Sequence, residues 1–389
     1  MNSNTIRVLA AGVAVAALAI QAQRGFSRNT NPQKDDVVAN AVNKGLKWLI
    51  SVQGADGGWG QDGGATSYVR QGENLETKGN DVANTAVAAT ALLHAGHNGE
   101  YRAAIERAVD FILRHVEESP AEGLAVTDLN GTQIQRKLGP FIDTFLSSKL
   151  LAELDGNMHN ARLNARVRQG LEKCVAKIEK NQLKDGSWNV AGGWAPILGT
   201  SMASQSLFMA QKKGLAVSNM AMARVEEYTA SAGQTASGIG AGVGGGIGDR
   251  VSSAEVSVAA SAGVPLYQGA QVLEQLSRTD KDRRKNAKQI KAITDRLSDD
   301  RFATGFGSMG GEEFFSYLNI SDSLHRTGGA EWEKWNGDMK TKLVRLQNDD
   351  GTWAGHHCIT GRVAVTSAAI LTMLAERDSF TMQSGMKKN

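Results

Sequence analysis

The pattern of hydrophobic and polar positions divides the chain into two kinds of helical segment that alternate. One kind carries charges along one face and is expected near residues 36–52, 100–117, 162–181, 218–232, 281–298 and 332–347. The other is rich in Ala, Ser, Thr and Leu and is expected near 81–95, 141–154, 196–211, within 252–276, 312–326 and 359–375. Small side chains let helix backbones approach closely, whereas a charged face needs solvent. The pattern predicts an all-α protein with two concentric rings of six helices, an α6/α6 toroid.

A short repeat follows three of the charged segments. In each copy Gln precedes Trp by six residues, and Asp-Gly stands just before the Trp: Gln53 with Trp59, Gln182 with Trp188, and Gln347 with Trp353. Asp-Gly provides a turn with a positive φ angle, and the Trp is expected to fold back over the helix end. The Gln amide is expected to bind helix-end carbonyls or the indole N–H. We interpret the repeat as a structural staple. Residues 300–307, with Phe instead of Trp, resemble a degenerate fourth copy.

Helical hairpins with Gln…Asp-Gly-x-Trp staples resemble the α/α-toroid group of squalene-hopene and other class II terpenoid cyclases and the β subunits of protein prenyltransferases. The resemblance covers about residues 36–375. In that group the two rings enclose a central cavity, and the chemistry takes place where inner helices form its wall or mouth. The resemblance therefore implies the fold, whereas function has to be carried over residue by residue.

The catalytic motifs of both enzyme groups are missing from this sequence. The cyclases protonate an isoprenoid with Asp-x-Asp-Asp, and the nearest analogue here is Asp81-Val-Ala-Asn84, with one carboxylate. Cyclases also line their cavity with aromatic rings, but Phe, Trp and Tyr make up only 6% of this chain. Prenyltransferases hold zinc with Asp-x-Cys and a distant His, and no Asp-x-Cys occurs. The sequence therefore favours a non-standard member of the group.

A zinc site is one interpretation of the segment after the third staple. His356, His357 and Cys358 offer imidazole and thiolate, the ligands that zinc prefers, and a carboxylate from a neighbouring helix would complete the site. The alternative is structural, with two histidines capping helix ends and a small buried cysteine. Arg362 follows on the last inner helix, where a charge needs a partner.

Acidic residues stand at the starts of several inner helices, namely Asp81, Asp143, Glu312 and Glu313. Helix capping and the helix dipole explain such residues without function. Asp143 lies in an apolar helix, where an unpaired carboxylate is costly. Two roles for it are equally open, a functional acid and a structural residue that caps the helix or pairs with an arginine. Because all inner helices of a toroid begin at the same end, we expect these carboxylates to converge with residues 356–362.

Two functions stay open at this stage. The first is a protein that binds a ligand or partner in the central cleft, such as a small molecule, an isoprenoid or a glycan. The second is an enzyme acting on an isoprenoid or polysaccharide, and whether the protein is catalytic is not decided by the sequence. The enzyme reading assigns catalysis to Asp81, Asp143 and His357, and ligand binding to Asn84, Glu312, Glu313 and Arg362.

Charge and cysteine content narrow the partners. The net charge is +3, from 43 Lys and Arg against 40 Asp and Glu, and the signs alternate along the chain. The sequence therefore shows no basic stripe of the kind that binds nucleic acid, and we expect no nucleic-acid partner. The 2 cysteines, Cys174 and Cys358, cannot form a disulfide framework.

The N-terminal segment predicts export. Arg7 precedes an apolar run at residues 8–20, and small residues suit cleavage either after Ala17-Leu18-Ala19 or after Ala22. We expect a signal peptide at 1–22, a polar connector at 23–35, the toroid at 36–378 and a flexible tail at 379–389. We therefore expect the protein to be secreted or periplasmic. The alternative is an uncleaved membrane anchor at residues 8–20, with the body facing outside the cytoplasm.

Overall fold

The computed structural model describes residues 32–61, 79–96, 99–189, 196–236, 263–303 and 310–377. The expected signal peptide, most of the connector, the tail and the Phe of the degenerate staple lie outside these residues. The chain divides into two units, Met1–Asn40 and Ala41–Asn389. The first unit is described only at 32–40, the opening turns of α2 (Pro32–Ser51). The remaining description concerns the second unit.

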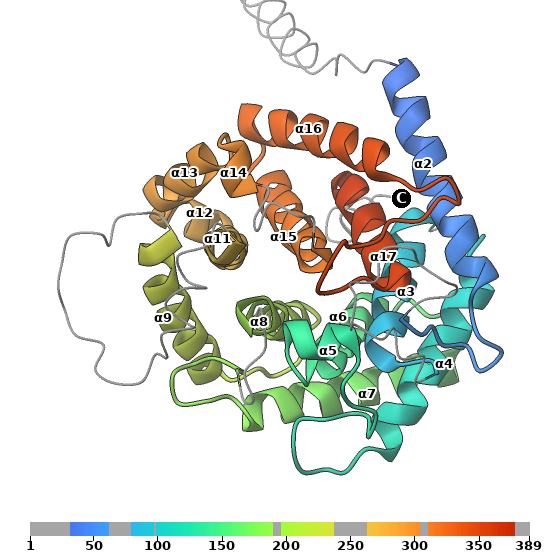
Figure 1. Cartoon of the computed structure of the whole chain (residues 1–389). Helices are drawn as coiled ribbons and strands as arrows, with labels where there is room; N and C mark the ends of the chain where they lie inside the picture. The colour runs from blue at the N-terminus through green and yellow to red at the C-terminus, as the bar shows by residue number, and fades with distance from the viewer. Residues whose placement is uncertain are drawn as a thin grey trace, which may run out of the picture. The chain divides into compact units, whose positions relative to one another are not determined.

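An inner ring of helices forms the core of this unit. Each helix of the ring packs against the next, and the last returns to the first; their bounds are α3 (Val82–Ala95), α6 (Ile142–Leu154), α8 (Pro196–Lys212), α11 (Gly263–Leu276), α15 (Gly311–Thr327) and α17 (Arg362–Met373). Figure 1 looks along the axis of the ring. Their small side chains allow burial on nearly all sides, as in α3, which is buried from Val82 to Leu92. The predicted all-α toroid is confirmed.

Amphipathic helices cover the ring from outside. They are α4 (Arg102–Glu118) on α3, α7 (Ala161–Lys180) on α6, α9 (Asn219–Ala236) on α11, and α16 (Ala330–Leu346) on α15. The prediction of a single helix at 281–298 is wrong. Two helices, α12 (Asp280–Lys285) and α13 (Ala287–Arg296), lie there with Asn286 between them. The short helices α14 (Asp300–Ala303) and η1 (Ala375–Arg377) follow. The exact division into six and six helices stays a prediction.

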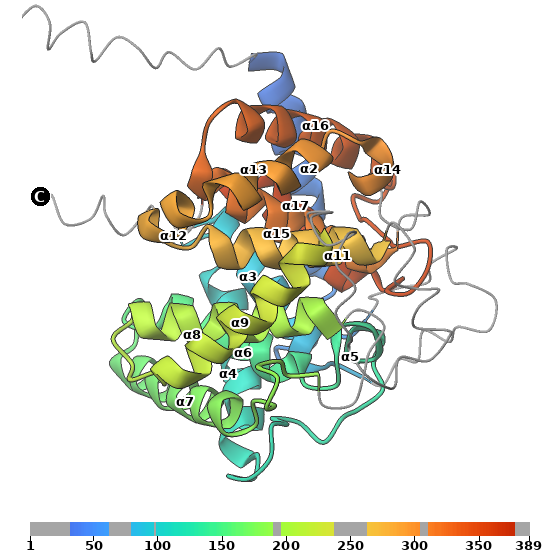
Figure 2. The same ribbon diagram turned by 90° about the vertical axis from the view of Figure 1, so that its left-hand side faces the viewer.

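The sequence pattern also missed α5 (Gln133–Leu138), which packs on α3, α6 and α8. A capping box begins this helix, in which Thr132 and Gln135 each bind the other's backbone N–H. Figure 2 turns the unit so that α5 lies at one end of the ring and α12 at the other. The end with α5 is the end at which the inner helices begin.

All three staples have the same geometry. The Trp59 indole N–H donates to the Leu49 carbonyl at 2.7 Å, ten residues earlier, and Trp188 and Trp353 repeat this bond with Ile178 and Leu343 at 2.7 Å. The three rings are at most 3% exposed. The turn glycine between Asp and Trp has a φ angle of 93°, 89° or 88° in the three copies, which only glycine adopts without strain. The predicted packing of Trp over the helix end is therefore observed.

The staple glutamine joins two outer helices. Gln53 Nε2 donates to the carbonyls of Gly57 and Ala104, both at 2.9 Å, and so links the turn to α4. The other two copies reach the next outer helix in the same way, Gln182 at Ala221 and Gln347 at Ala41. The amide satisfies carbonyls, and the indole N–H finds a helix-end carbonyl instead of the Gln. Among the described residues, no helix has the length and hydrophobicity needed to cross a membrane.

Candidate functional site

Two carboxylates meet at the start of α3. Asp81 caps the helix, and its two oxygens accept hydrogen bonds from the backbone N–H and side-chain amide of Asn84, both at 2.8 Å. Asp143, in the first turn of α6, accepts from the backbone N–H of Ala83 at 3.1 Å. Both side chains are almost fully buried. The two acids therefore share the N-terminus of one helix, where amide and backbone N–H groups of the described residues hold them.

Burial makes both acids weaker than ordinary aspartates. It raises the pKa of Asp81 to about 7, and the charge of Asp143 acts in the same direction, against the hydrogen bonds from Asn84. Burial likewise raises the pKa of Asp143 to about 6, against hydrogen bonds from Gln135 and Ala83. A group of this kind holds a proton near neutral pH and is able to donate it.

Helix α5 supplies polar contacts that the sequence reasoning missed. The side-chain amide of Gln135 donates to Asp143 at 2.7 Å. Gln133 accepts hydrogen bonds from the backbone N–H groups of Thr360 and Gly361, both at 3.0 Å, at the start of α17. The capping-box spacing Thr-x-x-Gln at 132–135 was the signal that would have predicted this helix. α5 therefore contacts the start of α17 and the acid pair.

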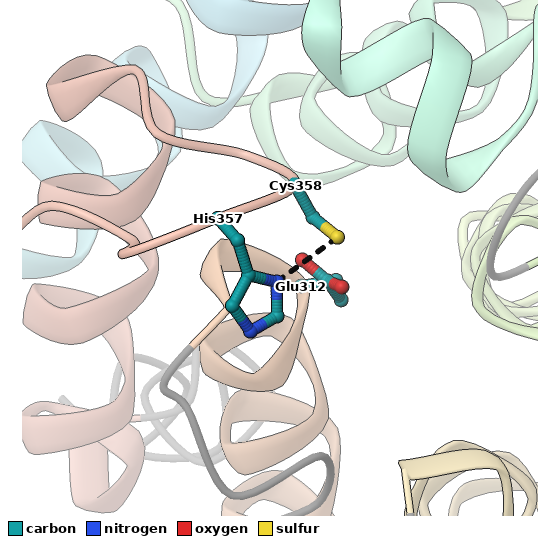
Figure 3. A group of neighbouring side chains, drawn as sticks. All are labelled: Glu312, His357 and Cys358. Atoms are coloured by element: carbon teal, nitrogen blue, oxygen red, sulfur yellow. Dashed lines mark hydrogen bonds between the residues drawn. The ribbon is translucent and has the colours of Figure 1, made fainter. Parts of the chain in front are cut away.

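A second group lies at the starts of α15 and α17. Glu312 stands in the first turn of α15, and His357 and Cys358 lie in the loop ahead of α17 (Figure 3). One ligand atom from each of the three residues lies within 4.8 Å of the others. The His357 Nδ1 is 3.0 Å from the Cys358 sulfur, as the dashed line marks. In the described part of the chain this is the only cluster of three such groups.

Glu312 is the unusual member of this group. Its side chain is fully buried, and both carboxylate oxygens lack a hydrogen-bond partner among the described residues. A buried carboxylate with neither a hydrogen bond nor a counter-charge costs several kcal/mol or more. Cys358 adds strain, because it has a φ angle of 63°, a left-handed conformation that costs about 1–3 kcal/mol outside glycine. Both features mark this place as a candidate binding site.

Tyr267, near the start of α11, faces the same group. Burial raises its pKa, the charges of Glu312, Glu313 and Cys358 raise it further, and the approach of its hydroxyl to the Glu312 carboxylate adds a smaller contribution. Tyr267 is 2% exposed. No sequence pattern singles out this tyrosine, because a tyrosine in an apolar helix is usually part of the core. Its phenol is thus a further polar group near the cluster.

Other residues from the sequence prediction lie elsewhere. Arg362 donates to the staple residue Asp350 at 2.6 Å, and its guanidinium lies 5.1 Å from the centre of the Trp48 ring. It therefore supports the third staple. His356 is exposed and does not belong to the cluster of three. The expected convergence is thus seen as two groups, the pair Asp81 and Asp143 and the group around Glu312.

One small void lies between inner helices among the residues that the structure describes. The void there measures about 20 Å³ and is lined by polar and apolar residues of five inner helices, among them Thr90, Lys149, Gln205 and Asn319. Gln205 donates to Asn319 across the ring at 3.1 Å. A void of this size holds about one water molecule. A larger pocket of about 360 Å³ lies between the end of α4 and residues 119–128.

Comparisons with known proteins agree on the fold. A sequence model of the squalene-hopene cyclase C-terminal domain matches residues 25–132, which include the first staple and α3. An arginine-to-alanine variant of the type II terpene cyclase MstE from Scytonema, in complex with geranylgeranyl dihydroxybenzoate, aligns with a TM-score of 0.53 and 12% identity, over 89% of this chain and 99% of that chain. No curated protein shows significant similarity to the sequence. The chain has the all-α toroid fold of the terpenoid cyclase-like superfamily.

Proposed function

We propose that this toroid is a zinc-dependent ligand-binding protein, with Glu312, His357 and Cys358 as the zinc ligands. The observation that carries the proposal is the buried carboxylate of Glu312, which lacks a hydrogen-bond partner among the described residues and lies beside an imidazole and a thiol. Thiolate, imidazole and carboxylate together form a typical zinc donor set. Tetrahedral coordination with bonds of about 2.0–2.3 Å separates ligand atoms by roughly 3–4 Å, which is compatible with a cluster of this size.

The donor set leaves room for a ligand. Three protein ligands leave one tetrahedral position open, and zinc supplies Lewis acidity to whatever donor occupies it. The protein would hold the carboxylate of Glu312 buried in the first turn of α15 and present His357 and Cys358 from the loop ahead of α17. Tyr267 offers a hydroxyl near this place for binding the same ligand.

We expect the ligand at the end of the ring that holds Glu312, His357 and Cys358, and not a cyclase substrate in its middle. The missing Asp-x-Asp-Asp motif argues in the same direction, since the cyclase reaction needs its acid at a large cavity. We place the protein outside the cytoplasm on the basis of its N-terminal sequence. Metal-supported binding is therefore favoured over cyclisation of a long isoprenoid.

Metal analysis of the purified full-length chain tests the proposal. Wild type is expected to hold about one zinc per chain, while E312Q, H357N and C358S each lose most of it. H356N is the matched control, because its imidazole is adjacent in sequence but exposed, and C174S controls for the second thiol. A zinc content near zero in wild type after reconstitution, or full zinc content in E312Q, contradicts the assignment.

The acid pair favours a second candidate, an enzyme that protonates its substrate. Asp81 and Asp143 have pKa values raised to about 7 and 6, which suits a general acid near neutral pH. Incubation with geranylgeranyl dihydroxybenzoate, the compound bound to the Scytonema cyclase, distinguishes the two proposals. A cyclised product of unchanged mass that disappears in D81N supports the enzyme. Unchanged starting material together with stoichiometric zinc supports the binding protein.

A further inference from the structure

At the opposite end of the ring, two arginines share one buried carboxylate. Arg278 follows the end of α11 and donates from Nε and Nη2 to the two oxygens of Glu274, at 2.8 and 2.5 Å. Both side chains are 3% exposed. Arg326, in the last turn of α15, lies with Nη2 4.0 Å from Glu274 Oε1. Two positive charges therefore face a single negative one, and a buried excess charge is costly.

The same arginines carry donors that lack acceptors. Arg278 Nη1 and Arg326 Nε are buried and have no hydrogen-bond partner among the described residues. The other two nitrogens of the Arg278 guanidinium have acceptors, since Nε and Nη2 reach Glu274 and Nη2 also reaches Ser204 at 2.9 Å. Ser323 and Ser277 lie 3.3 and 3.5 Å from Arg326 Nη2. The N–H groups at Arg278 Nη1 and Arg326 Nε thus need an acceptor that the described residues do not supply.

The helix dipole explains part of this arrangement but not all of it. Three inner helices end here, and their C-termini favour cations by about 0.3–1 kcal/mol each. Phe208 of α8 adds a second attraction, with the Arg278 guanidinium 5.3 Å and the Lys212 ammonium 5.4 Å from its ring centre. Neither the dipole nor the ring provides an acceptor in line with an unpaired guanidinium N–H. A ligand with oxygen acceptors supplies what is missing.

Ser204, Glu274, Arg278 and Arg326 are here called the arginine cluster, and we propose that its two arginines, held in place by Glu274 and Ser204, bind a small oxyanion such as a phosphate or carboxylate group. Guanidinium groups present N–H donors in a fixed plane that matches the oxygens of either anion. The oxyanion would neutralise the excess positive charge and accept from Arg278 Nη1 and Arg326 Nε. Arg326 is 23% exposed, which gives the anion a route from solvent. The proposal does not depend on the zinc ligands at the other end.

Titration calorimetry and thermal unfolding of the full-length chain test the arginine cluster. Inorganic phosphate and acetate are compared with chloride at equal ionic strength. We expect a saturable rise in melting temperature with one or both oxyanions and little change with chloride. R326Q is the main variant, because it removes the excess charge and leaves the pair of Arg278 and Glu274 intact. It should weaken oxyanion affinity about tenfold or more.

Matched variants make the result specific. R283Q removes an arginine on α12 that already pairs with Asp280 and should bind the oxyanion like wild type. C358S alters the other end of the ring and should also leave the affinity unchanged. Saturation by phosphate alone assigns a phosphate group, and saturation by acetate alone assigns a carboxylate. Equal effects of chloride and both oxyanions, or unchanged affinity in R326Q, overturn the proposal. The double variant E274Q/R278Q, which removes the pair as a unit, should also lose binding.

Discussion

The two ends of the inner ring differ in the charge they bury. The end where the inner helices begin holds acids, among them Asp81, Asp143 and Glu312. The end where they finish holds bases, among them His94, Arg278 and Arg326. This distribution complements the helix dipoles, which favour anions at N-termini and cations at C-termini.

The ends also differ in how their carboxylates are compensated. Glu153 lies 2.7 Å from His94, and although burial alone would raise its pKa, the charge and hydrogen bond of His94 lower it. Glu274 is paired with Arg278. By contrast, Asp81 and Asp143 are held by amide and backbone donors, and their pKa values are raised. Equal burial thus leads to opposite shifts, and the presence of a counter-charge decides which. The uncompensated end is the one suited to hold a proton or a metal ion.

The largest expected effect comes from the staples, which lie at the acidic end. W353A and W188A should each lower the free energy of unfolding by about 3–5 kcal/mol, because each removes a buried aromatic side chain. Urea unfolding measures this loss. Only W353A should also lose zinc, since Trp353 directly precedes the loop with His357 and Cys358. Loss of zinc in both variants alike would show that the cluster depends on the whole ring instead of its own loop.

The acid pair should make the protein less stable as pH rises. A raised pKa means that the folded state binds its proton more tightly than the unfolded state, so the benefit is full below about pH 4 and is lost as pH rises through the folded pKa values near 6 and 7. Asp81 alone should account for roughly 2–3 kcal/mol between pH 5 and pH 7. Glu153 behaves oppositely, because its pKa is lowered in the folded state. Its stabilising effect is present above the ordinary pKa of a glutamate and is lost as pH falls below that value.

D81N tests this pH dependence, because asparagine keeps the helix cap but does not titrate. Urea unfolding at pH 5, 6 and 7 should show a flatter dependence than in wild type. D128N, which alters an exposed carboxylate, is the control and should leave the slope unchanged. An identical slope in wild type and D81N would show that Asp81 does not carry a raised pKa.

Replacing Glu312 by Gln should have opposite effects on the stability of the protein without and with zinc. In EDTA, E312Q should be at least as stable as wild type, because neither carboxylate oxygen of Glu312 accepts a hydrogen bond that the amide would lose. With zinc at about one hundred times its dissociation constant, wild type should gain about 2.7 kcal/mol and E312Q close to none. Thermal unfolding with and without zinc measures both. Lower stability of E312Q in EDTA would mean that the buried carboxylate has a partner in the metal-free protein.

Single hydroxyl groups should have the smallest effect and should act alike at both ends. Thr85 accepts from the backbone N–H of Trp59 at 2.9 Å and donates to the Asp81 carbonyl at 2.6 Å. Ser204 accepts from Arg278 at 2.9 Å and donates to Gln275 at 3.0 Å. T85V and S204A each remove two hydrogen bonds and should each cost about 1–3 kcal/mol in urea unfolding. A much larger loss at one end would show that hydrogen-bond geometry, rather than buried charge, distinguishes the two ends.

Most helices could be predicted from the sequence because their pattern is local. The expected segments 81–95 and 196–211 differ from α3 and α8 by one residue at one end. The helix at 281–298 failed, since Asn286 interrupts it without changing the polar pattern. α5 was missed because its six residues are too short for a helical period to emerge. For the site, Cys358 and His357 were identified with a carboxylate left unnamed, whereas Tyr267 gave no signal.

The sequence by itself determined the alternation of helices, the staples and the residue types available for a site. These depend on spacing within about ten residues, where helix period and turn chemistry act. Only the tertiary structure decided which groups meet. It places Glu312 next to residues 357–358, pairs Arg362 with Asp350, and leaves His356 exposed. It also set each pKa shift, because burial and counter-charge arise when helices distant in sequence pack together.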